Sequence, residues 1–289
     1  MLLNPVEVVD AIDPASFKLN YYDAMKPVVI KNLSAEWPAY SKWDWDYFKY
    51  TLGTVKVGVY NNTKSDAHTP TNKADDYMLF GDYLDIVRQG PVHLRIFLFN
   101  LFLHAPELVQ DFTWPDEMMT GYVKRFPMLF VGGAGSVTHM HFDIDMSHIL
   151  HTQFMGRKRV LLFPFEEQYK LYRKPWEVLS LVNFEKYYDP VASKINYKEF
   201  PAINNAQGFE ITLNHGDTLF MPAGYWHHME YIDSGFAMSL RAMQNSMSGK
   251  LSGAWNLFVM RNIDTIMKKT APDWWYNFKK NRTFEAAGH

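Results

Sequence analysis

The sequence predicts a mainly β protein, a sandwich or barrel of short strands flanked by an N-terminal α/β part and by C-terminal helices. Three observations support this fold class. Hydrophobic residues make up 47% of the 289 residues, which is enough for a packed core. Aromatic residues reach 16%, which favours a β-rich core over a helical bundle. The middle of the chain divides into many short runs that end at Gly, Asp, Asn or Pro.

Residues 1–120 are expected to form an N-terminal α/β part that packs on the core. The segment alternates β-like runs with helix-like runs. The β-like runs include KPVVIKNL and VKVGVYN, and the helix-like runs include WDYFKYTL and GDYLDIVRQ. The chain starts with early acidic residues and without a long apolar run. We therefore expect no signal peptide, no membrane partner and a cytoplasmic location.

Residues 121–245 are expected to form the core domain. Strand candidates follow one another here, with turn signals between them. They are PMLFVGG, SVTHMHFD, HTQFMG, RKRVLLFP, FEITL, DTLFMP, YWHHMEYI and FAMSLRAM. Many short strands separated by turns are typical of a sandwich or a barrel.

Residues 246–289 are expected to be helical. Apolar residues recur there at three- and four-residue steps, at Leu257, Met260, Ile263 and Met267. An apolar stripe on a terminal helix also predicts a homodimer that associates through this segment.

The composition excludes several classes of function. A formal net charge of −2 provides no basic surplus for a phosphate backbone, so we expect no nucleic-acid partner. Zero cysteines exclude disulfides, zinc–thiolate sites and thiol nucleophiles. Any metal must therefore be bound by His, Asp or Glu.

His141 and Asp143 are the first candidate pair for chemistry. Residues two apart in a strand point to the same face, so this imidazole and this carboxylate can converge. A His-x-Asp triplet is common by chance in a chain with eleven His. Indeed His215 and Asp217 form a second triplet, but the intervening Gly216 indicates a turn before a strand.

His227 distinguishes the first triplet from the second. It lies in the run GDTLFMPAGYWHHM, which reads as a strand, a Pro-Ala-Gly turn and a returning strand. Such a strand can bring His227 opposite the first pair. Two His and one carboxylate leave three coordination positions open, as in ferrous oxygenases. A zinc hydrolase would accept the same ligands, whereas a closed structural zinc site would need a fourth.

The neighbours of these ligands leave alternatives open. His139 shares the strand face of His141 and could compete as a ligand. His228 should point away from the face of His227 and pack in the core. Thr138 lies three residues before His141, so either the strand contains a bulge there or Thr138 is only structural.

Lys158 is the candidate anion-binding residue. It lies on one strand face with Val160 and Leu162, while Arg157 and Arg159 face the other way. A lysine that points into an apolar interior needs an anion. The alternative is a solvated basic turn in which the lysine extends outward to water.

Three stretches occur together, in order, over roughly residues 130–245. They are SVTHMHFD, QFMGRKRVLLFPFEEQYKLY and GFEITLNHGDTLFMPAGYWHHME. They resemble the cupin-like JmjC family of Fe(II)- and 2-oxoglutarate-dependent oxygenases, and the asparaginyl hydroxylases of that family are nearest in pattern. The N-terminal run KPVVIKNLSAEWPAYSKW is similar to the opening segment of the family.

The resemblance implies a double-stranded β-helix, or jelly-roll, core in which His141, Asp143 and His227 bind iron. It implies that Lys158 pairs with the distal carboxylate of 2-oxoglutarate, helped by the hydroxyl of Thr138. It also implies dioxygen as a cosubstrate, a protein or peptide as the substrate, and dimerisation through the C-terminal helices.

The chain departs from the family pattern at several positions. The family's Asn near the metal is missing from DIDMSHILHTQF, where His148 and His151 appear, and this loop is about two residues longer. Arg241 lies where an Asn is expected in the last core strand. Arg95 lies near the place of a Tyr of the 2-oxoglutarate pocket.

These patterns predict a 2-oxoglutarate-dependent dioxygenase that hydroxylates a protein side chain. One alternative is a non-catalytic cupin-fold binding or regulatory protein, and a second is an N-methyl demethylase. A third, a metal hydrolase or isomerase, would need a general base near bound water, for which Glu230 and Asp145 are the candidates.

Overall fold

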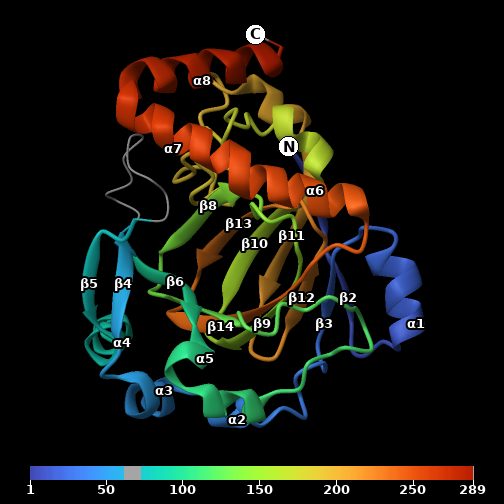
Figure 1. Ribbon diagram of the computed structural model, residues 1–289, viewed down its shortest axis with the longest axis vertical. Helices are drawn as coiled ribbons and strands as arrows, with labels where there is room; N and C mark the ends of the chain where they lie inside the picture. The colour runs from blue at the N-terminus through green and yellow to red at the C-terminus, as the bar shows by residue number, and fades with distance from the viewer. Residues whose placement is uncertain (62–72, 289) are drawn as a thin grey trace.

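The centre of the protein consists of two β-sheets, seen in the computed structural model of Figure 1, which describes residues 1–61 and 73–288. The smaller sheet has the order β1-β11-β10-β13-β8, and the larger has the order β2-β3-β12-β9-β14-β7-β6-β4-β5. The smaller sheet comprises β1 (Leu2–Pro5), β8 (Val137–His141), β10 (Lys158–Phe163), β11 (Gln207–Leu213) and β13 (Trp226–Tyr231). The larger comprises β2 (Glu7–Val9), β3 (Val28–Ile30), β4 (Lys56–Asn61), β5 (Asp76–Leu79), β6 (Leu94–Asn100), β7 (Met128–Gly132), β9 (His148–Met155), β12 (Thr218–Met221) and β14 (Gly235–Ala242).

The core strands β7 to β14 match the strand candidates of the sequence one for one. They are divided between the sheets, since β7, β9, β12 and β14 lie in the larger sheet and the other four in the smaller. This arrangement is the double-stranded β-helix that the sequence predicts. A cluster of buried apolar side chains fills one part of the space between the sheets; it includes Ile149, Val160, Leu162, Leu219, Met221 and Met229.

The N-terminal part extends the larger sheet. Strand β3 pairs with β12, and β6 pairs with β7, both antiparallel. The helices are α1 (Pro14–Phe17), α2 (Pro38–Lys42), α3 (Trp45–Leu52), α4 (Phe80–Arg88) and α5 (Leu101–His104), with a π turn at Lys18–Tyr22 and a 3₁₀ turn at Pro106–Asp111. The expected β3, β4, α3 and α4 are present, and α3 and α4 bury Phe48, Leu52, Phe80 and Leu84 against the sheet.

The segment between β10 and β11 covers the outer face of the smaller sheet. It contains two short 3₁₀ turns, Phe165–Tyr169 and Pro201–Asn205. Its Phe184 and Phe200 pack in one cluster with Phe163 and Trp226 of the sheet.

The C-terminal segment is helical, as the apolar spacing predicts. Helix α6 (Met247–Trp255) continues through a π turn (Asn256–Met260) into α7 (Arg261–Thr270), and α8 (Pro272–Ala286) follows. Figure 1 shows these helices across one end of the molecule, near β8 and the segment after β10. In the part of the chain that the structure describes, no helix has the length and apolar character that a membrane span requires.

Candidate metal centre

The three predicted metal ligands converge between β8 and β13. The two strands are antiparallel, and His141 lies opposite His227. Their ring centroids are 4.1 Å apart. Asp143 lies two residues beyond the end of β8, and one ligand atom from each of the three residues lies within 4.8 Å of the others. Within residues 1–61 and 73–288, this is the group of His, Asp and Glu that could hold a metal ion.

Backbone carbonyl groups orient both imidazoles. Nδ1 of His141 lies 2.8 Å from the carbonyl oxygen of His139, and Nδ1 of His227 lies 3.2 Å from that of Tyr225. Because a carbonyl oxygen only accepts, each Nδ1 carries the proton and donates it. Each Nε2 then has a free lone pair for a metal, the arrangement in which metal-binding histidines are normally fixed.

Burial and neighbouring charges shift the pKa values of the three candidate ligands towards the ionisation states in which they can bind a metal. Burial, helped by the charge of His227, lowers the pKa of His141 to about 3, and burial also lowers the pKa of His227. Burial would raise the pKa of Asp143, but Arg241 and the two histidines lower it to about 2. At neutral pH the group therefore offers two neutral imidazoles and one carboxylate, which is a donor set that fits Fe(II).

Arg241 of β14 holds the acidic side chains of the site. Its guanidinium donates to Asp143 at 2.9 Å and to both carboxylate oxygens of Asp145 at 3.0 Å. Asp145 is therefore engaged as an ion-pair partner and is not a free base. Glu230, three residues beyond His227 in β13, lies on the opposite strand face. Neither residue has the position that a hydrolase mechanism would need.

A bulge in β8 resolves the geometric question about Thr138. His141 pairs with His227 and Thr138 pairs with Met229, so three steps on β8 oppose two on β13. Thr138 and His141 can therefore share the inner face of the sheet. His139 falls within this bulge and is not part of the metal-ligand group. His228 is fully buried on the outer face near Phe184, as strand alternation predicts.

Lys158 is buried inside the barrel, with 1% of its surface exposed. Its Nζ lies 3.0 Å from Nε2 of His151 and 4.5 Å from the ring centroid of Tyr231. Burial lowers the pKa of Lys158 to about 7. The flanking arginines point outward, since Arg157 pairs with Asp233 and Arg159 lies over the ring of Tyr188.

The remaining residues that the sequence analysis noted have other surroundings. The guanidinium of Arg95 lies 4.8 Å from the ring centroid of Phe97, and its charge acts on Tyr231 inside the barrel. His148 stacks on Phe220 and accepts a hydrogen bond from the backbone N–H of Ala223. The second triplet forms the expected turn; there His215 lies 2.7 Å from the carbonyl oxygen of Phe154, and Asp217 accepts from the backbone of Asn214.

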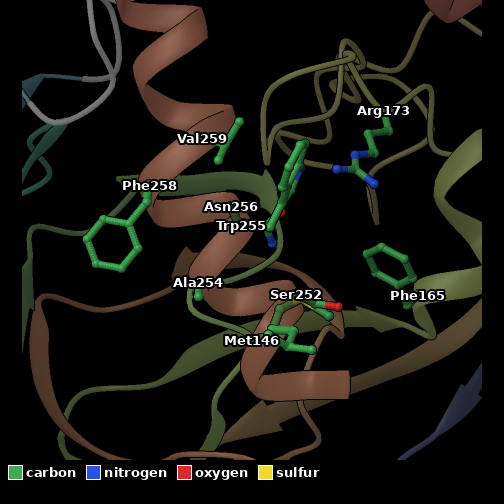
Figure 2. Close-up of a pocket in the computed structure, with 10 residues that line it drawn as sticks. Met146, Phe165, Arg173, Ser252, Ala254, Trp255, Asn256, Phe258 and Val259 are labelled. Carbon is green, nitrogen blue, oxygen red and sulfur yellow. The ribbon is translucent and has the colours of Figure 1, made fainter. Parts of the chain in front are cut away.

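A groove of about 660 Å³ lies between the C-terminal helix and the core, and the sequence analysis did not predict it. Figure 2 shows the continuous helix of α6 and the π turn along one side, with Phe165 and Arg173 across from it. Met146, three residues after Asp143, also lines the groove. The full lining is Met146, Phe165, Arg173, Leu251, Ser252, Ala254, Trp255, Asn256, Phe258 and Val259. Only the packing of the C-terminal helix on the core creates this groove, so strand patterns give no signal of it.

Residues 14–252 match the family model described as a cupin-like domain. This chain belongs to the cupin-like domain family. The cupin-like match covers the predicted strands β7 to β14, every proposed ligand and the first six residues of α6.

The curated relatives of this cupin-like protein are distant. It is 25% identical over 249 residues to lysine-specific demethylase 8 of Danio rerio, covering 82% of this chain and 59% of that protein. It is 32% identical over 235 residues to HSPB1-associated protein 1 of Bos taurus, covering 72% and 46%. It is 24% identical over 250 residues to human JMJD7, a bifunctional peptidase and (3S)-lysyl hydroxylase, covering 75% and 77%. The chain thus spans about half the length of the first two, and the relatives include both a demethylase and a hydroxylase.

Proposed function

We propose that this protein is an Fe(II)- and 2-oxoglutarate-dependent oxygenase that hydroxylates a protein side chain. The observation that supports it most strongly is the convergence of His141, Asp143 and His227 with their free donor atoms together. Bound Fe(II), with 2-oxoglutarate as electron donor, would supply the dioxygen activation that C–H hydroxylation requires. The balanced reaction converts 2-oxoglutarate, dioxygen and substrate into succinate, carbon dioxide and hydroxylated substrate.

The protein's own residues would bind and orient the reactants. His141 and His227 bind iron through Nε2, because each Nδ1 donates to a backbone carbonyl. Asp143 supplies the third ligand, and Arg241 fixes the direction of its carboxylate. Lys158 binds the distal carboxylate of 2-oxoglutarate, helped by the hydroxyl of Thr138, through charge-assisted hydrogen bonds.

The substrate is proposed to be a protein or peptide in the cytoplasm, rather than a nucleic acid or a membrane lipid. The groove lined by Met146, three residues after Asp143, supports a peptide, because it is largely apolar and bordered by one cation, Arg173. Hydroxylation is preferred to N-methyl demethylation because the three motif stretches resemble those of asparaginyl hydroxylases. A mass gain of one oxygen in a treated peptide supports hydroxylation, and loss of a methyl group supports the demethylase alternative.

The direct test is turnover of 2-oxoglutarate to succinate by purified protein with Fe(II) and ascorbate, with His141→Ala as control. Succinate formed by the unaltered protein alone would support the oxygenase. A complete lack of turnover, together with a lack of iron-dependent 2-oxoglutarate binding, would favour the non-catalytic cupin-fold alternative.

We also propose that the protein is a homodimer associating through its C-terminal helices. Large apolar side chains are exposed there outside the groove, at Ile266 and Trp274. Exposed apolar side chains gathered on one segment are typical of an interface. Light scattering at micromolar concentration should give twice the chain mass, and a monomeric mass would contradict the dimer.

A further inference from the structure

We infer that His151 and Ser239 position the amino group of Lys158 and thereby make the site selective for 2-oxo acids that have a second carboxylate. This inference rests on the proposed function and deepens it. Lys158 is the group that would contact the cosubstrate, and the other two residues act through it as positioning residues.

The contact between Lys158 and His151 joins the two sheets across the interior of the barrel. Lys158 begins β10 of the smaller sheet, whereas His151 lies in the middle of β9 of the larger sheet. Ser239 is the direct partner of His151 in the neighbouring strand β14. His151 and Ser239 are 1% and 2% exposed, so water cannot easily replace these contacts.

The hydrogen bonds among these three residues have one direction when Lys158 is protonated, which is the form that binds a carboxylate. The ammonium then has only donors, so Nε2 of His151 accepts at 3.0 Å. Nδ1 of His151 therefore carries the proton and donates to the hydroxyl of Ser239 at 2.7 Å. Ser239 thus selects the tautomer that can hold the lysine, and burial keeps His151 uncharged by lowering its pKa well below the usual range.

A neutral partner leaves the lysine available for an anion. Over residues 1–61 and 73–288, no carboxylate lies within ion-pair distance of Lys158. The ring of Tyr231 covers one side of the ammonium, and His151 takes one of its three N–H groups. A carboxylate at position 151 would neutralise the lysine and compete with the ligand. An imidazole fixes the direction of the amino group without cancelling its charge.

The experiment compares two ligands that differ only in the distal carboxylate. Binding of 2-oxoglutarate and of 2-oxopentanoate is measured by calorimetry without dioxygen, with Mn²⁺ as the bound metal. His151→Leu should weaken 2-oxoglutarate binding about tenfold, the effect of a lost hydrogen bond to a charged group, and leave 2-oxopentanoate within about twofold. His151→Gln keeps an acceptor and should restore most of the affinity. Ser239→Ala should weaken 2-oxoglutarate binding about threefold.

His148→Gln is the matched control. It replaces a second buried histidine of β9, on the opposite face of the strand and in contact with the ring of Phe220 instead of Lys158. It should change the affinity for neither ligand. Far-UV circular dichroism checks that each variant folds. If His151→Leu does not fold, the test uses the affinity for 2-oxoglutarate relative to that for 2-oxopentanoate in His151→Gln and Ser239→Ala.

The outcomes separate this inference from the proposed function. If the unaltered protein binds 2-oxoglutarate and His151→Leu binds it equally well, the inference fails and the proposed function stands. Equal weakening of both ligands would show a merely structural role for His151 and would also overturn the inference. If the unaltered protein does not bind 2-oxoglutarate at all, the proposed function fails and the inference with it.

Discussion

Two groups of buried ionisable side chains differ in how their charges are balanced. The first is the C-terminal ion network, defined as Glu177, Asp264, Lys268 and Lys279. Lys268 lies 2.8 Å from both Glu177 and Asp264, and Lys279 contacts the same two carboxylates. Burial would raise the pKa of Glu177, but the lysines, including the nearby Lys174, hold it well below its usual range.

The second group lies inside the barrel, where charges are not matched in this way. Lys158 faces an imidazole instead of a carboxylate, and its pKa is lowered to about 7 by burial. His141 and His227 hold their Nε2 atoms together, although two lone pairs do not attract one another. In the C-terminal ion network each charge has a partner of opposite sign within the protein, whereas the Lys158 ammonium and the two imidazole lone pairs of the barrel group have none among the residues that the structure describes; under the proposed function, 2-oxoglutarate and a metal ion would supply these partners.

The largest expected effect is the loss of turnover on removing a metal ligand. Asp143→Ala should lower succinate formation at least about 1,000-fold, because the metal's stabilisation amounts to several kcal/mol. Asp217→Ala, in the second His-x-Asp triplet, should keep both the iron content and turnover. Comparable losses in the two variants would contradict the assignment of the first triplet as the metal site.

The next effect concerns the stability of the C-terminal ion network. Glu177→Gln leaves buried lysines without their shared carboxylate and should lower the free energy of unfolding by about 3–5 kcal/mol. Urea titration measures this change, while iron binding should stay intact. Glu285→Gln, which removes an exposed partner of Arg282, should cost no more than about 0.5 kcal/mol.

Lys158 should make the free energy of unfolding rise with pH, whereas a lysine stabilised by a carboxylate makes it fall. Its pKa falls from about 10.5 in the unfolded chain to about 7 in the folded protein, so between these values only the unfolded state holds the proton. The free energy of unfolding therefore rises with pH across this window, and below pH 7 the whole penalty is present. Without ligand, Lys158→Met should stabilise the protein by about 2–3 kcal/mol at pH 6.5 and by much less at pH 9.5.

Lys279→Met is the comparison variant for this measurement. It should destabilise the protein at both pH values, because Glu177 and Asp264 lose a buried partner. Thermal unfolding of both variants at the two pH values measures the difference. If Lys158→Met destabilises the protein at pH 6.5, the charged lysine has favourable partners inside the barrel. That result would contradict the contrast between Lys158 and the C-terminal ion network.

The smallest effect concerns Arg241, the residue that is ion-paired within the barrel group. Arg241→Gln should weaken Fe(II) binding about tenfold, because Asp143 loses the hydrogen bond that orients it. Arg157→Gln, in an exposed ion pair with Asp233, should leave iron affinity unchanged. Tighter iron binding in Arg241→Gln would mean that the arginine's charge opposes the metal more than its hydrogen bond helps.

The sequence by itself determined the strands of the core and the direction of many of their side chains. Two-residue alternation is a local property, so it correctly separated His227 from His228 and Lys158 from its flanking arginines. Turn residues marked the ends of β7 to β14, and three-to-four-residue spacing marked the C-terminal helices.

Only the tertiary structure decided which of these side chains meet. The bulge that brings Thr138 to the face of His141 depends on how β8 pairs with β13, and alternation alone left it open. Arg241 and Asp143 are 98 residues apart, and Lys158 and His151 touch only because the two sheets face each other. The groove likewise exists only where α6 packs beside Met146. Such contacts depend on strand register and on the closing of the barrel, which are set by the packing of the whole core and not by any short segment.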